Sequence, residues 1–333
     1  MDQQLNQASA PMPRVLTVTP SPHVRRKGLK TSVIMVDVIL ALIPATVWGI
    51  IAFGFSAFLV VALATGSAVF FEWMMRKLMK RSMTISDCSA AVTGLLLGLN
   101  LSAAVPWYVP IVGSAFAIIV VKQLFGGIGR NIMNPALAAR VFLMMCWPAA
   151  MSEYPAAFAK GVDVVAGATP LVSLKNGMMP DASLLDLFLG KTGGCIGEIS
   201  ALLLLVGGVY LIWRRVISWQ IPLGMLGTVA LLTFLFPQGD MGRVQFMVAS
   251  LCSGGVMIGA IYMATDYVTS PVTTIGRVIY GIGCGLLVVF IRFFGGYPEG
   301  TSFAILIMNT MVWYLDMATK PRVYGKSRRK RGA

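Results

Sequence analysis

Residues Thr31–Phe53 read TSVIMVDVILALIPATVWGIIAF, and this run contains a single charged side chain, Asp37. About 20 consecutive apolar residues are enough to cross a bilayer as a helix, so the stretch predicts a transmembrane segment. The whole chain has the same character: 57% of its residues are hydrophobic, its mean hydropathy is +0.78 and only 12% of its side chains are charged. Soluble domains carry about 25% charged residues. The sequence therefore predicts an integral membrane protein.

Ten apolar stretches of this kind follow one another, separated by polar or Gly- and Pro-containing segments. They cover Thr31–Phe53 and residues 56–75, 90–105, 109–124, 135–147, 196–213, 220–236, 245–264, 277–294 and 301–317. The fifth is short, which indicates either an earlier start in the preceding Gly-rich stretch or a broken helix that lines a cavity. We therefore expect an all-α fold with about ten transmembrane helices. The first thirty residues lack the apolar core of a secretion signal, so the first span should direct insertion.

The distribution of Lys and Arg predicts the orientation, because short cytoplasmic loops accumulate these residues. With the N-terminus inside, 21 of them fall on the inner side and five on the outer side. Both termini should therefore lie in the cytoplasm and the protein in the cytoplasmic membrane of a bacterium or archaeon. The chain then divides into a tail (1–30), a first membrane half (31–147), an outer loop (148–195), a second membrane half (196–317) and a basic tail (318–333). The net charge of +14 is explained by this orientation and gives no reason to expect nucleic acid.

Several kinds of chemistry lack their residues in this sequence. The single histidine, His23, excludes bis-histidine haem ligation, and the five cysteines form no C-x-x-C pair that would suggest an iron–sulfur cluster. No phosphate-binding Walker loop or nucleophile elbow occurs, and the glycines of residues 126–129 lack the spacing of a dinucleotide fingerprint. If this chain handles electrons, an organic cofactor must carry them.

Residues 163–173 in the outer loop read DVVAGATPLVS and place a hydroxyl on an accessible backbone. Gly167 and Ala168 remove side-chain bulk beside Thr169, and Pro170 favours an extended conformation for the residue before it. A hydroxyl in this setting is open to covalent modification. An ordinary turn of small residues is the alternative reading of the same stretch.

The stretch resembles the flavinylation motif D-x-x-[S/T]-G-A-[T/S], at which an FMN transferase joins FMN through its phosphate to the last hydroxyl. Asp163, Gly167, Ala168 and Thr169 match the motif, whereas Ala166 stands where Ser or Thr is usual. Further segments resemble the same family in order along the chain. They are SPH at 21–23, GRNIMNPA at 129–136, GCIGEIS at 194–200, MATDYVTSP at 263–271 and TIGR at 274–277. The family is that of the D subunit of the Rnf ion-translocating electron transport complex, together with the related B subunit of the sodium-pumping NADH:quinone reductase.

This resemblance implies a membrane subunit with covalent FMN at Thr169, in a complex that couples electron transfer between ferredoxin and NAD to Na⁺ or H⁺ transport. The partners implied are the FMN-bearing G subunit, the membrane A and E subunits, the cytoplasmic C subunit, membrane lipid and the FMN transferase. The phosphoester bond would tether the ring and leave it free to accept one or two electrons.

A noncovalent riboflavin is the second cofactor that the resemblance implies, and two polar clusters are candidates for its site. Asn131 and Asn134 lie three residues apart at the start of the fifth span, and Asp266, Thr269 and Ser270 follow the eighth. Polar groups at membrane depth are usually functional. Capping of helix ends explains the same residues equally well.

The two clusters occupy comparable places in two halves of five spans, which predicts two inverted repeats. Family resemblance then suggests a urea-transporter-like fold, and with it a rival function: a channel or secondary transporter without a redox role. Acidic residues in or beside the spans are candidates for ion passage: Asp37, Glu72, Asp87 and Asp316. For Glu72 we expect a structural ion pair with Arg76, one helical turn on. Asp37 lies deeper and is the better candidate for a functional role.

Overall fold

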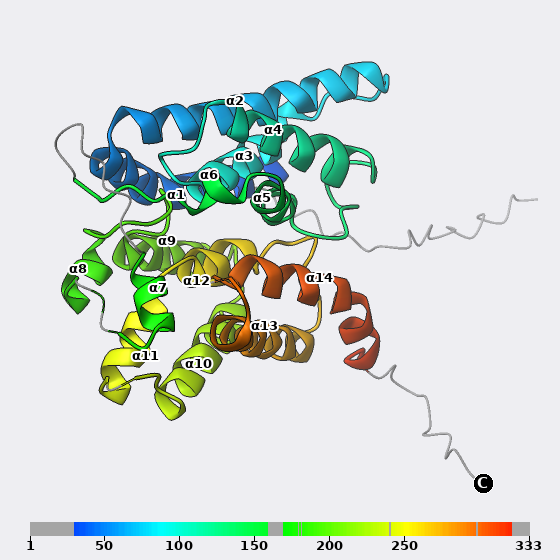
Figure 1. Cartoon of the computed structure of the whole chain (residues 1–333). Helices are drawn as coiled ribbons and strands as arrows, with labels where there is room; N and C mark the ends of the chain where they lie inside the picture. Colours follow the sequence, from blue (N-terminus) through cyan, green and yellow to red (C-terminus); the bar gives the residue numbers. More distant parts are fainter. Residues whose placement is uncertain are drawn as a thin grey trace, which may run out of the picture.

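The structure is a computed structural model that describes residues 30–158, 169–178, 180, 182–239, 241–297 and 299–321. Within these residues the regular structure is helical, without a strand (Figure 1). The first part holds α1 (Thr31–Phe53), α2 (Phe55–Leu78), η1 (Ile85–Asp87), α3 (Ser89–Leu99), α4 (Tyr108–Ala115), the π-helical η2 (Phe116–Gln123) and α5 (Pro135–Cys146). Three short helices follow: α6 (Pro148–Ser152), α7 (Pro170–Lys175) and α8 (Leu184–Leu189). The last part holds α9 (Ala201–Trp213), α10 (Gln220–Leu235), α11 (Arg243–Cys252), α12 (Val256–Ile258), the π-helical η3 (Gly259–Met263), α13 (Thr274–Phe294) and α14 (Thr301–Ala318).

Helices α1, α2 and α13 are each long and apolar enough to cross a membrane. A fourth crossing results if α11 and the segment from α12 to η3, which meet at a bend of 66°, count as one broken span. The other apolar helices are shorter, between 10 and 17 residues. An all-α, multi-pass membrane protein is thus confirmed for the described residues, and the number of ten crossings stays a prediction.

The surface of α1 shows why such helices belong in lipid. Val36, Leu40, Ile43 and Val47 are between 40% and 49% exposed and recur at the spacing of one helical face. Asp37, the charged residue of this helix, is buried instead. A helix with apolar residues outside and its charge inside suits an apolar solvent.

Three predicted spans differ from the structure by five residues or more at one end, or are broken. The helix expected at 90–105 ends at Leu99, and the Asn100 side chain that follows it donates to Leu96 O (2.7 Å). The helix expected from residue 196 begins at Ala201. The stretch expected as one helix at 245–264 is broken after Cys252, where Gly254 takes a positive φ of 71° that terminates the helix.

The packing divides the chain into two sets of helices. In the first, α2 packs against α3 and α4, and η2 packs against α5; in the second, α10 packs against α11 and α13, and α13 packs against α14. Helix α1 contacts α9, and α5 contacts α14, so the two sets share one apolar core. Figure 1 shows α2, α3 and α4 on one side of the molecule and α10 and α13 on the other. The short helices α7 and α8 lie at one end of the molecule, away from the C-terminal ends of α2 and α14.

Candidate functional site

Thr169 is the residue before α7 and begins a described segment of the chain. Its backbone is extended (φ −63°, ψ 148°) and Pro170 occupies the first turn of the helix, so the predicted effect of the proline is confirmed. The Thr169 side chain makes no capping hydrogen bond to α7, which leaves its hydroxyl available. Asp163, Gly167 and Ala168, the other predicted motif residues, lie outside the described residues.

A cavity of about 400 Å³ adjoins Thr169. This volume lies within the range of roughly 300–1,000 Å³ typical of sites for organic ligands. Its lining comes from six parts of the chain: the end of α5 with α6, the start of α7, α8, residues 192–199, the break between α11 and α12, and the segment before α14. Much of the lining is apolar, and Met144, Met151 and Leu171 contribute to it. Glu198, Ser253 and Glu299 add polar atoms to the same cavity.

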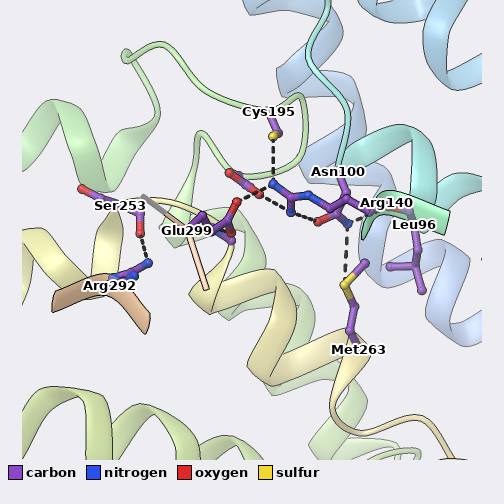
Figure 2. A network of polar contacts seen from close by, with 10 residues as sticks. Leu96, Asn100, Arg140, Cys195, Ser253, Met263, Arg292 and Glu299 are labelled. Atoms are coloured by element: carbon purple, nitrogen blue, oxygen red, sulfur yellow. Dashed lines mark hydrogen bonds and ion pairs between the residues drawn. The ribbon is translucent and has the colours of Figure 1, made fainter. Parts of the chain in front are cut away.

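Arg140 organises the polar side of this cavity (Figure 2). The residue is 2% exposed in the interior of α5, and its guanidinium donates to Asn100 Oδ1 (2.6 Å), Glu198 Oε1 (3.0 Å) and Glu299 Oε2. The same group contacts Cys195 Sγ at 3.5 Å. These partners come from the end of α3, the segment before α9 and the segment before α14, so one guanidinium joins both sets of helices.

A second buried arginine lies beside this network. Arg292 donates to Ser250 O (2.7 Å) and Ser253 O (2.9 Å) and thereby holds the break between α11 and α12. The backbone N–H of Gly255 donates to Glu299 Oε1 (2.6 Å). Two arginines thus accompany two glutamates, and the balance of charge lowers the cost of burying all four.

Tyr154 also lines the cavity, in the loop that follows α6. Burial raises the pKa of its phenol well above the ordinary value. The hydroxyl is therefore neutral at physiological pH and can donate a hydrogen bond to a ligand.

Part of this network has a local signal in the sequence. Arg140 lies within the fifth predicted span, and an arginine inside an apolar stretch needs a buried partner. Cys195 and Glu198 belong to the segment GCIGEIS, which carries part of the family resemblance without an assigned role. Asn100 and Glu299 have no local signal, because their meeting with Arg140 depends on how distant helices pack.

The two polar clusters considered for riboflavin meet in the structure. Asn131, Asn134 and Asp266 line one cavity, and the Thr269 hydroxyl donates to Asp266 Oδ2 (3.0 Å). Ser270 is bonded through its backbone N–H to Asp266 O (3.1 Å). Burial raises the pKa of the Asp266 carboxyl, and the Thr269 hydroxyl opposes this shift.

This second cavity has a volume of only about 80 Å³. A whole flavin ring needs more room, and Asn134 Oδ1 already accepts from Ala136 N (3.0 Å) at the start of α5. Capping of α5 and binding of a ligand would both use the Asn134 side chain. Noncovalent riboflavin therefore stays a prediction.

The acidic residues considered for ion passage have protein partners. Asp37 accepts from Arg214 (3.0 Å) and from Tyr210 (3.0 Å). Asp87 and Asp316 accept from backbone N–H groups. In the described residues no group of three or more His, Cys, Asp or Glu side chains is arranged to hold a metal ion.

The expected ion pair between Glu72 and Arg76 is wrong. Glu72 pairs with Lys122 Nζ (3.0 Å) on η2, and it also accepts from Gln123 Nε2 (3.1 Å) and Thr84 Oγ1 (2.9 Å). The rule that pairs side chains one turn apart describes an isolated helix. Packing of η2 against α2 supplies a nearer cation than Arg76.

The sequence is similar to known proteins along most of its length. The model of the NQR2, RnfD, RnfE family matches residues 17–325. The chain is 48% identical over 323 residues to the D subunit of the Na(+)-translocating ferredoxin:NAD(+) oxidoreductase complex of Acetobacterium woodii, covering 96% of this chain and 98% of that protein. It is 41% identical over 325 residues to the D subunit of the proton-translocating ferredoxin:NAD(+) oxidoreductase complex of Clostridium ljungdahlii, covering 94% and 97%. It is 35% identical over 351 residues to the D subunit of the ion-translocating oxidoreductase complex of Escherichia coli O7:K1, covering 93% and 99%.

Proposed function

Because the chain belongs to the NQR2, RnfD, RnfE family, we propose that it is the flavin-carrying membrane subunit of an Rnf-type complex. Relatives with near-complete coverage are named as D subunits of ion-translocating ferredoxin:NAD⁺ oxidoreductases. The chain accordingly works as one part of a translocase, with Na⁺ or H⁺ as the coupling ion. Its partners are the G, A, E and C subunits, with an FMN transferase for maturation.

The observation that carries the proposal is the position of Thr169 at a cavity of about 400 Å³. The hydroxyl is the attachment atom for the FMN phosphate, and the extended backbone holds it clear of α7. The apolar lining suits a flat aromatic ring, and the polar groups suit its edge. When bound, FMN supplies one- and two-electron transfer; the residues of this chain fix its position and exclude water from it.

The arrangement of charge supports an outer position for this site. Arg76 and Lys77 lie in the last turn of α2, and Lys320 follows α14. These helix ends lie away from α7 and α8 (Figure 1). With the basic ends in the cytoplasm, Thr169 faces the outer side, where the G subunit would exchange electrons with it.

The packing pattern supports two inverted repeats. Helices α1 to α5 of the first set correspond in chain order to α9, α10, α11 with α12, α13 and α14 of the second. Each set has the same neighbours: the second helix packs on the third and fourth, and the fourth element packs on the fifth. Five elements in each half would invert one half relative to the other.

The test is the variant Thr169→Val, which has nearly the same shape without the hydroxyl. In membranes that contain an FMN transferase, we expect this variant to insert normally and to lose covalent flavin entirely. Loss of flavin should not result from unfolding, because this substitution at the edge of the cavity should change the free energy of unfolding by less than about 0.5 kcal/mol. The readouts are fluorescence of the band on a denaturing gel and the mass of the peptide that contains Thr169.

Thr192→Val is the matched control, since Thr192 lines the same cavity. This variant should keep its flavin, and Thr169→Ser should keep part of it because a hydroxyl remains. Flavin on the Thr169→Val chain would show that the attachment site is another residue. A wild-type peptide of unmodified mass would favour a channel or transporter without a redox role.

A further inference from the structure

Ser253 stands out among the residues that line the Thr169 cavity. The residue is 2% exposed, and its hydroxyl oxygen has no hydrogen-bond partner in the described part of the chain. Buried polar atoms are nearly always bonded, because an unsatisfied one loses its hydration without compensation. The hydroxyl therefore indicates that a polar group of a ligand belongs beside it.

The surrounding backbone fixes this hydroxyl in place. Ser253 is the C-cap residue that follows α11, and its carbonyl accepts from Arg292 at 2.9 Å. The following Gly254 adopts a positive φ of 71°, which turns the chain into α12 at an angle of 66°. The serine is thus held at a helix break that faces a cavity, a place where irregular backbone is tolerated in a membrane protein.

Two carboxylates share the same cavity and are equally fixed. Glu198 and Glu299 are both bonded to Arg140, and Gly255 N donates to the second oxygen of Glu299 at 2.6 Å. Arg140 itself does not line the cavity and acts only through the two glutamates. The cavity therefore presents one hydroxyl donor and two carboxyl groups in a defined arrangement.

This set of groups matches one end of a flavin ring. The pyrimidinedione edge of an isoalloxazine carries two carbonyl acceptors and one N–H donor, whereas the dimethylbenzene end is apolar. The Ser253 hydroxyl can donate to one carbonyl, and the Glu299 carboxylate can accept from the N–H. Burial and the neighbouring Glu299 raise the pKa of the Glu198 carboxyl to about 7, so in its protonated form this group can donate to the second carbonyl. Met144, Met151 and Leu171 line the same cavity and suit the apolar end.

We propose that Ser253, Glu198 and Glu299 form the binding site for the pyrimidinedione edge of the flavin ring whose phosphate is attached to Thr169. The inference rests on the proposed function and extends it from the attachment atom to the residues that orient the ring. Arg140 is a positioning residue that keeps both carboxyl groups in place.

The test compares Ser253→Ala with Ser253→Thr in the purified, flavin-loaded chain. Flavin content is measured from peptide mass, and access to the ring is measured by acrylamide quenching of flavin fluorescence. Loss of one hydrogen bond corresponds to about a fivefold change in an equilibrium between a seated and an accessible ring. We expect Ser253→Ala to keep its covalent flavin and to raise the ratio of accessible to seated ring about fivefold. Ser253→Thr should behave as wild type, because it retains the hydroxyl.

Ser250→Ala is the matched control, since Ser250 is also buried on α11 but does not line this cavity. Quenching should be unchanged in this variant. Unchanged quenching in Ser253→Ala, or an equal rise in quenching in Ser250→Ala, would contradict the proposed binding site. A wild-type chain without attached flavin would instead overturn the proposed function, so the two failures are distinguishable.

Discussion

At the scale of single residues, the buried ion pairs join side chains that lie far apart in the sequence. Glu72 meets Lys122 and Arg140 meets Glu198 and Glu299, with separations of 50 residues or more. Burial of charge is costly unless the charges are paired and hydrogen-bonded. These pairs therefore require that the helices pack in one arrangement, because any other leaves a charge without compensation.

The Glu72 pair gives a prediction about stability. Lys122→Met removes the cation and leaves the Glu72 carboxylate buried at 1% exposure. We expect a loss of roughly 3–5 kcal/mol of stability, measured as a lower melting temperature in detergent. Glu72→Gln combined with Lys122→Met should recover most of this loss, because no charge is then left unpaired.

Lys77→Met serves as the comparison, since Lys77 is exposed and its Nζ lies over the Trp73 ring, 5.0 Å from the ring centroid. Its effect should stay below about 1 kcal/mol. Equal melting temperatures for Lys122→Met and Lys77→Met would show that Glu72 has another partner.

At the scale of elements, close approach of helices depends on glycine. A side chain at Gly94 on α3 would lie 2.6 Å from Ala64 O and 2.7 Å from the Cα of Thr65, both on α2. Small residues allow helix backbones to approach closely in membranes, where packing rather than the hydrophobic effect joins helices. The α2–α3 contact thus depends on the absence of a side chain at Gly94.

Gly94→Ala should separate α2 from α3. We expect a cost of about 1–3 kcal/mol from overpacking, with a lower melting temperature and reduced yield of folded protein. Gly66→Ala on α2 is the control, because nothing lies within 4 Å of its added methyl group. This change should be neutral or stabilising by up to about 1 kcal/mol, since alanine favours a helix over glycine. A stable Gly94→Ala chain would argue against this close contact.

At the scale of the whole molecule, the candidate site belongs to neither half alone. The cavity beside Thr169 is lined by residues from α5 and from the break between α11 and α12, and Arg140 bonds to residues of both sets of helices. The site therefore exists only when the two halves are assembled. Helix α7, which follows Thr169, lies away from the basic C-terminal ends of α2 and α14 (Figure 1), which agrees with the predicted orientation.

The orientation gives the prediction at this scale. In a background with Cys88 and Cys146 replaced by alanine, a cysteine at Asn176 should react with an impermeant thiol reagent added to intact cells, because this exposed residue follows α7. A cysteine at the exposed Arg81 after α2 should react only after the membrane is opened. The charge bias of the loops is the physical reason. Labelling of Arg81→Cys in intact cells would show that the orientation is the reverse of the predicted one.

The sequence by itself determined the class of protein, the bounds of α1, the extended backbone at Thr169 and the family resemblance. These follow from local properties: apolar run length, the restriction that proline places on the preceding residue, and short motifs. The partner of Glu72, the break at Ser253 and the meeting of Arg140 with Glu198 and Glu299 came only from the tertiary structure. They depend on which helices pack together, and side chains 40 to 159 residues apart leave no local pattern of their contact.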